Sequence, residues 1–177
     1  MIVLGLDAGF SLPGYAIVDT VENVVLCAGG ISTARTSKTE RKKQPNFYVS
    51  HDDARRVIYL FSELKQIIDK YKPVIACVEL PIGAGRSSAA VKGMAYAAAI
   101  AAILVHCCGL EPVWLTPRQN KLASTNLPDA EKEQVWAGVQ RRFPNVDWPR
   151  NKHGAYDKLV CWAMADALST IMYYESL

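Results

Sequence analysis

The first nineteen residues, MIVLGLDAGFSLPGYAIVD, constrain the fold more than any other part of the chain. They read as a strand that ends in a carboxylate at Asp7, a turn that contains glycine, and a second strand. Gly9 and Gly14 leave the approach to Asp7 free of side chains. Glu79 repeats the arrangement, because it interrupts the apolar run VIACVELP. An acid inside a buried strand is unfavourable by several kcal/mol unless it is paired or bound to a metal. The two acids therefore indicate a divalent-metal site.

Length and composition fit a single globular domain over residues 1–177, with 50% hydrophobic and 21% charged residues. A disordered chain would be less apolar and more charged. The formal net charge of +3 is mildly basic. It permits a nucleic-acid partner without requiring one.

The cysteines indicate a reducing compartment. Their number is odd and their spacing matches neither a disulfide framework nor a zinc site, with cysteines at positions 27, 77, 107, 108 and 161. The N-terminus lacks the basic region and cleavage site of a signal peptide. The apolar stretch from Met94 to Cys108 is shorter than a membrane span of roughly 20 residues, and its alanine content suits a buried helix. We therefore expect a soluble, cytoplasmic protein without a membrane partner.

The order of the elements predicts an α/β fold. We expect strands over residues 2–8, 14–20, 24–33, 74–80 and 112–117, and helices over about 52–71, 88–108, 117–124, 129–143 and 154–174. The polar, basic segment 35–50 is expected to be a loop. Three strands in succession, followed by alternating helices and strands, predict a mixed sheet flanked by helices. Its three N-terminal strands would be antiparallel and the later ones parallel.

These motifs, taken together, resemble the RuvC family of Holliday-junction resolvases within the ribonuclease H-like superfamily. The resemblance covers nearly the whole chain, in the order LGLDAG, GYAIVD, VIACVELP, SSAAVKGMAYAAAIAA, TPRQNKLA and AEKEQV. It implies a ribonuclease H-like sheet and a homodimer that cuts four-way DNA junctions symmetrically and leaves a 5′-phosphate. It also implies two Mg²⁺ ions per active site, with Mn²⁺ as a substitute. Two such ions about 4 Å apart can activate water and stabilise the leaving oxygen.

The family needs further metal ligands near the start of its last helix, and the chain offers two candidate motifs. In HGAYD, His153 and Asp157 are four residues apart and would share a helical face. In ADALS, Asp166 matches the family's Asp-Ala-Leu signature, but Trp162 and Ala163 stand where a partner ligand is expected. Asp157 and Asp166 are half a turn out of phase and roughly 13 Å apart along a helix axis, so one helix cannot aim both at one site.

We assign the metal ligands as Asp7, Glu79, His153 and Asp157, because the helical face of Asp157 is apolar and is expected to point inward. A histidine departs from the most common family pattern. Asp166 is kept as the alternative ligand, and otherwise as a surface acid.

Two lysines complete the expected catalytic set by resemblance. Lys121 in TPRQNKLA and Lys132 in AEKEQV match family lysines that approach the scissile phosphate. An ammonium group there can neutralise developing charge. The alternative is that they are ordinary solvated surface lysines.

Three further residues are candidates for DNA binding. Arg86 and Arg118 could hold backbone phosphates, and Ile82 stands where the family inserts an apolar side chain into the junction centre. Apolar wedges of this kind can unstack a base step. The alternative for Ile82 is a loop residue packed on the protein.

Two segments have both a structural and a functional interpretation. The stretch from Arg35 to Lys43 holds five Lys or Arg and one Glu. It is either a solvated loop or an arm that follows DNA phosphates with salt-sensitive affinity. The alanine-rich helix within 88–108 either packs closely on the sheet or, by resemblance, builds a two-fold dimer.

The function expected from these features is a Mg²⁺-dependent endodeoxyribonuclease that resolves four-way junctions. A related nuclease acting on other branched or flapped DNA is the close alternative. An actin-like ATP-binding domain also begins with a strand, Asp-x-Gly and a hairpin, but it needs two such domains. A DNA-binding scaffold without catalysis is opposed by the acids present. The expected location is the cytoplasm, or the host cytoplasm if the protein is viral.

Overall fold

The computed structural model describes residues 1–44, 46–82 and 87–177. Five strands form one mixed sheet in the order β3-β2-β1-β4-β5. β1 pairs antiparallel with β2, and β2 pairs antiparallel with β3. β4 pairs parallel with both β1 and β5. The predicted mixed sheet with three antiparallel N-terminal strands is therefore confirmed.

The strands and helices follow one another in the expected order, with one additional short helix, α1. The strands are β1 Ile2–Asp7, β2 Gly14–Asp19, β3 Val24–Gly30, β4 Ile75–Glu79 and β5 Glu111–Leu115. The helices are α1 Lys38–Lys43, α2 Val49–Tyr71, α3 Ser88–Cys107, α4 Pro117–Thr125, α5 Lys132–Arg142 and α6 Lys158–Glu175.

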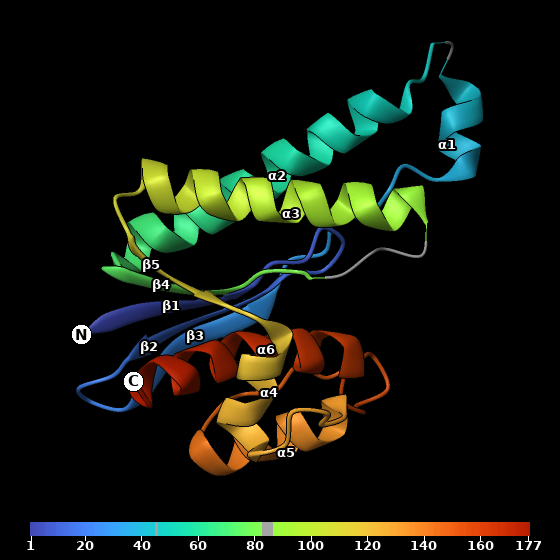
Figure 1. The fold of residues 1–177 in the computed structure, drawn as a ribbon. Helices are drawn as coiled ribbons and strands as arrows, with labels where there is room; N and C mark the ends of the chain where they lie inside the picture. Colours follow the sequence, from blue (N-terminus) through green and yellow to red (C-terminus); the bar gives the residue numbers. More distant parts are fainter. Residues whose placement is uncertain (45, 83–86) are drawn as a thin grey trace.

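Helices cover both faces of the sheet, as Figure 1 shows, with α2 and α3 on one face and α4, α5 and α6 on the other. Each interface is mainly apolar, although Arg56 of α2 and Ser169 of α6 are also buried. The core beneath α2 includes Leu60 and Leu64, whereas the core beneath α6 includes Met164 and Leu168. This three-layer arrangement buries both faces of the central strands, which explains why β1 and β4 read as continuous apolar runs.

Helix α6 lies unusually close to the sheet because glycines face it. A Cβ atom at Gly5 would overlap the main-chain oxygen of Ala167, and one at Gly14 would overlap that of Ala163. The alanines of α6 and the glycines of β1 and β2 thus allow backbone to approach backbone. This contact sets the depth at which side chains of α6 reach the end of β1.

Several sequence predictions of element bounds are wrong, and helix α2 begins at Val49 rather than near residue 52. Segment 35–50 is not a continuous loop, because α1 forms within it, started by a capping box between Ser37 and Glu40. Helix α5 begins at Lys132 rather than near residue 129. Helix α6 begins at Lys158 rather than near residue 154, with the Asp157 side chain accepting a hydrogen bond from the Val160 N–H as its N-cap.

Helix α3 is longer than its most apolar stretch. Its 20 residues, Ser88–Cys107, make it long and apolar enough to cross a bilayer, whereas the prediction considered only the shorter stretch from Met94 to Cys108. Core helices of globular proteins pass the same test, and one such helix is weak support for a membrane span. Ala97, Ile100 and Leu104 of α3 pack in the core against the sheet and α2.

Candidate active site

Asp7 and Glu79 lie side by side at one end of the sheet. They are the last residues of β1 and β4, and they pair directly in the parallel register. The Ala8 N–H donates to the main-chain oxygen of Glu79 at 3.1 Å, which ties the two strand ends together. Because the carboxyl ends of parallel strands share one edge, the two acids are neighbours although 72 positions apart by their numbers.

Asp166 lies close to this pair. It is only 4% exposed, so the prediction that it is a surface acid is wrong. The reason is that α6 is buried on all sides from Ala163 to Ile171, since the sheet covers one side and α4 and α5 cover the other. Its charge is among the causes that raise the pKa of both Asp7 and Glu79.

The three carboxyl groups form a site with excess negative charge. Burial, followed by the charges of Asp166 and Glu79, raises the pKa of Asp7 well above its ordinary value. Burial and the Asp166 charge raise the pKa of Glu79 to about 7. Burial likewise raises the pKa of Asp166, although the ammonium of Lys132 opposes the shift. Like charges held together in a poorly solvated place favour a bound cation.

Both predicted lysines approach the carboxylates. Lys132, the first residue of α5, forms an ion pair with Asp166, and its side chain is about half exposed. Lys121 of α4 carries a charge that lowers the pKa of Glu79 and of Asp166. Two cationic side chains thus border the acidic cluster from the helical layer.

Asn120 is a site residue that the sequence analysis missed. It is 1% exposed, and its side-chain amide donates hydrogen bonds to Glu79 Oε2 and, at 3.0 Å, to the main-chain oxygen of Asp166. An asparagine inside TPRQNKLA carries no signal that separates it from a solvated helix residue.

His153 and Asp157 occupy a different setting from the one expected. Both precede α6, so the prediction that they share a face of that helix is wrong. His153 is exposed, in a turn where its N–H donates to Asn151 Oδ1 at 2.9 Å. Asp157 caps the helix and is not among the charges that shift the pKa of Asp7.

Of the three predicted DNA-binding residues, Ile82 is 61% exposed and lies three residues after Glu79, the end of β4. Arg118 is exposed in the first turn of α4. Arg86 lies outside the described residues. Ile82 and Arg118 therefore both stand on elements that follow the carboxyl ends of parallel strands.

The donor set fits a hard divalent cation. Carboxylate oxygens are the ligands that Mg²⁺ prefers. Within residues 1–44, 46–82 and 87–177, no three His, Cys, Asp or Glu side chains stand in a ready-made metal cage. Instead, Asn120 donates a hydrogen bond to one oxygen of Glu79, and Lys132 donates one to an oxygen of Asp166. The charge and chemistry of the acids thus suit a cation, and their side chains would need local adjustment around it.

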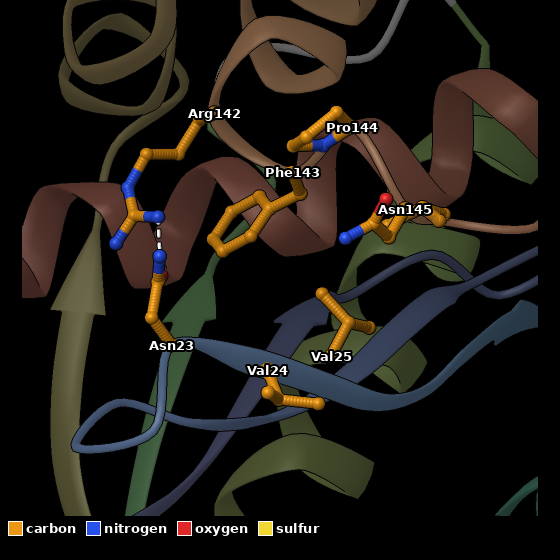
Figure 2. A pocket seen from close by; sticks show the side chains of 8 residues that line it. Asn23, Val24, Val25, Arg142, Phe143, Pro144 and Asn145 are labelled. Carbon is orange, nitrogen blue, oxygen red and sulfur yellow. Dashed lines mark hydrogen bonds between the residues drawn. The ribbon is translucent and has the colours of Figure 1, made fainter.

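A pocket of about 190 Å³ lies elsewhere, between the β2–β3 turn and the end of α5. Figure 2 shows its lining, which includes Asn23, Arg142 and Phe143. This is the end of the sheet opposite Asp7, because Asp19 pairs with Ile2 whereas Asp7 pairs with Gly14. The acidic cluster is therefore the better candidate for the chemistry.

Comparison with known proteins agrees with the fold. The family model described as "Crossover junction endodeoxyribonuclease RuvC" matches residues 3–159. The chain belongs to the RuvC family. The predicted resemblance to that family is confirmed, and with it the predicted class of enzyme, an endodeoxyribonuclease.

Individual RuvC proteins cover almost the entire chain. The crossover junction endodeoxyribonuclease RuvC of Prochlorococcus marinus (strain MIT 9211) is 27% identical, over 99% of this chain and 97% of its own. The protein of the same name from strain MIT 9303 is 30% identical, over 90% of this chain and 94% of its own.

Solved structures share the fold at lower identity. RuvC of T. thermophilus in complex with a Holliday junction substrate has a TM-score of 0.69 and 21% identity, and covers 99% of this chain and 96% of that one. The yeast mitochondrial Holliday junction resolvase Ydc2 has a TM-score of 0.63 and 14% identity, and covers 98% of this chain and 78% of its own. These likenesses confirm the predicted α/β fold, a mixed five-stranded sheet flanked by helices.

Proposed function

We propose that this RuvC-family chain is a metal-dependent endonuclease that resolves four-way DNA junctions by symmetric phosphodiester hydrolysis. The observation that carries the proposal is the meeting of Asp7, Glu79 and Asp166 at one end of the sheet in a chain of this family. Glu79 and Asp166 are each held by a hydrogen bond or ion pair from a neighbouring helix.

In this proposal the metal ligands are Asp7, Glu79 and Asp166, and Asp166 replaces His153 and Asp157 in the expected set. The support is that Asp166 is buried against the two strand-end acids, whereas Asp157 is committed to capping α6. The family match ends at residue 159, so the choice of Asp166 depends on this geometry. The expected count of two Mg²⁺ ions, replaceable by Mn²⁺, stays a prediction.

Mg²⁺ bound by these acids would supply a Lewis acid that activates water and neutralises charge on the phosphate. The chain's own residues do the rest. Lys132 and Lys121 stand beside the carboxylates, where an ammonium group can stabilise the charge that develops on a pentacovalent phosphorus. Asp166 keeps Lys132 directed at the site through their ion pair.

DNA would approach from the end of the sheet that carries the acids. Ile82 and Arg118 both follow strand ends at that edge, and we propose that they contact the junction as an apolar wedge and a phosphate ligand. The six-residue basic helix α1 stands beyond the start of α2 in Figure 1. None of its residues, all of which the structure describes, is buried, so its lysines are free to meet phosphates.

A homodimer completes the proposal, because symmetric cleavage of two strands needs two sites. Helix α3 supports it. Val91 and Ile103 of α3 are 50% and 52% exposed, so they are available to pack against a second copy of the chain. An Ile103→Glu variant that stays dimeric in light scattering would argue against this interface. Because the substrate is DNA and the cysteines suit a reducing compartment, we propose a cytoplasmic location.

The test is incubation of the purified protein with a synthetic four-way junction, a flap and a linear duplex, each with Mg²⁺ and with EDTA. We expect paired nicks at symmetric positions in the junction, with Mg²⁺ only. Preferential cutting of the flap would favour the alternative of another branched substrate. Cleavage in EDTA, or none with any metal, would refute the proposal. ATP binding would instead favour the actin-like alternative.

A further inference from the structure

Asn120 occupies the centre of the helical layer over the candidate site. It lies in α4, is 1% exposed, and reaches two different elements with one amide group. The nitrogen of that group donates to Glu79 Oε2 at the end of β4 and to the main-chain oxygen of Asp166 in α6, at 3.0 Å to the latter. One nitrogen thus joins the two elements that bring Glu79 and Asp166 together.

The backbone of helix α4 at Asn120 is held against α6 by contacts that do not involve Glu79. The Ser169 hydroxyl of α6 donates to the main-chain oxygen of Asn120 at 2.6 Å. One residue earlier, Gln119 Nε2 donates to the Tyr173 hydroxyl at 2.8 Å. Helix α4 is therefore fastened to α6 at residues 119 and 120, and the amide nitrogen has a second acceptor, the Asp166 main-chain oxygen, besides the Glu79 carboxylate.

The same side-chain amide does not form all the hydrogen bonds available to it. Its oxygen, Oδ1, is buried and has no hydrogen-bond partner among the described residues. Leaving a buried amide oxygen unpaired costs about 1–3 kcal/mol. A leucine of similar size would avoid that cost, so packing alone does not account for asparagine at this position. A donor aimed at Glu79 does account for it.

We propose that Asn120 is a positioning residue that holds the Glu79 carboxylate in a metal-binding orientation and at a fixed position relative to Asp166. The inference rests on the proposed function, because it takes Glu79 and Asp166 as ligands of the catalytic metal. The hydrogen bond to Oε2 restricts rotation of the carboxylate, so the side chain loses less conformational entropy when a cation binds.

The test compares Asn120→Leu with Ser169→Ala. The first variant removes the donor to Glu79, and the second removes a fastening of α4 without touching Glu79. Mn²⁺ binding to the DNA-free protein is measured by calorimetry, thermal unfolding is measured in EDTA, and junction nicking is measured across a Mg²⁺ titration. Asn120→Ser is made alongside, so that the test survives if the leucine variant does not fold.

We expect Asn120→Leu and Asn120→Ser to raise the Kd for Mn²⁺ by about 10-fold, the lower end of the effect for groups that orient metal ligands. The Mg²⁺ concentration for half-maximal nicking should rise by about the same factor, while the rate at saturating Mg²⁺ falls by less than about threefold. Ser169→Ala should leave the Kd within about twofold, with a lower unfolding temperature.

Three results would overturn the inference. Wild-type Mn²⁺ affinity in both Asn120 variants would show that the hydrogen bond does not order Glu79. An equal loss of affinity in Ser169→Ala would assign the effect to helix packing. Wild-type protein that binds no Mn²⁺ would refute the inference together with the metal site. Wild-type protein that binds Mn²⁺ but cuts no DNA would refute the proposed function and leave the binding comparison decisive for Asn120.

Discussion

Replacing Glu79 with glutamine should stabilise the metal-free protein at neutral pH. Burial, followed by the Asp166 charge, raises the pKa of Glu79 from its ordinary 4.5 to about 7. The folded state therefore binds this proton more tightly than the unfolded chain does. It follows that the free energy of unfolding falls as the pH rises from 4.5 to about 7, and stays low above that.

The size of the effect follows from the two pKa values. The gap between 4.5 and about 7, at about 1.4 kcal/mol per pH unit, corresponds to roughly 3.5 kcal/mol of stability lost by pH 8. Glutamine keeps the shape of the side chain, and its oxygen can accept the hydrogen bond from Asn120, but it carries no charge. We expect Glu79→Gln to be about 2–3 kcal/mol more stable than wild type at pH 8, and nearly equal to it near pH 5.

The assay is urea unfolding in EDTA at several pH values between 5 and 8.5. Glu111→Gln is the control, since Glu111 is an exposed glutamate on the neighbouring parallel strand β5. Mg²⁺ at about 100 times its Kd should restore about 2.7 kcal/mol to the wild type and so remove the advantage of the variant. A Glu79→Gln protein that is less stable than wild type at pH 8, or a difference that does not change with pH, would refute the reasoning.

Three further experiments test other parts of the structure. Gly14→Ala should lower the free energy of unfolding by about 3 kcal/mol or more, because a Cβ there overlaps the Ala163 oxygen. Gly93→Ala is the control, because a Cβ at Gly93 would make only ordinary contacts and should not lower that free energy. Equal effects of the two substitutions would contradict the close packing of α6. Lys132→Gln should slow single-turnover nicking by about 100-fold at unchanged junction affinity, and an unchanged rate would remove Lys132 from the catalytic set. A Lys42→Ser, Lys43→Ser double variant should reduce the slope of log K against log salt by about 2, and an unchanged slope would show that α1 does not meet DNA.

The strand-borne part of the site could be predicted from sequence. Asp7 and Glu79 each interrupt an apolar run, and a strand buried on both faces leaves few explanations for an acid. Their side-by-side placement then follows from parallel pairing, which the register of β1 and β4 confirms. The order and pairing of the other strands could also be predicted from sequence, because turn residues and apolar runs are local signals.

The helix-borne part could not be predicted in this way. The choice between Asp157 and Asp166 assumed one inward face, but α6 is buried all around between Ala163 and Ile171, so periodicity says little about direction. The sequence also predicts that this helix begins near residue 154, and that start places Asp157 on a helical face instead of at the N-cap. Helix α1, by contrast, carried a readable signal in the spacing of Ser37 and Glu40.

The most direct test of the account is the single-turnover rate of junction nicking in Asp166→Asn compared with Asp157→Asn. Asparagine caps a helix about as well as aspartate, so Asp157→Asn should fold normally and cut within about threefold of the wild-type rate. Asp166→Asn removes a ligand charge from the acidic cluster and should cut at least about 1000-fold more slowly in Mg²⁺. A full rate in Asp166→Asn with a severe loss in Asp157→Asn would contradict the site described above.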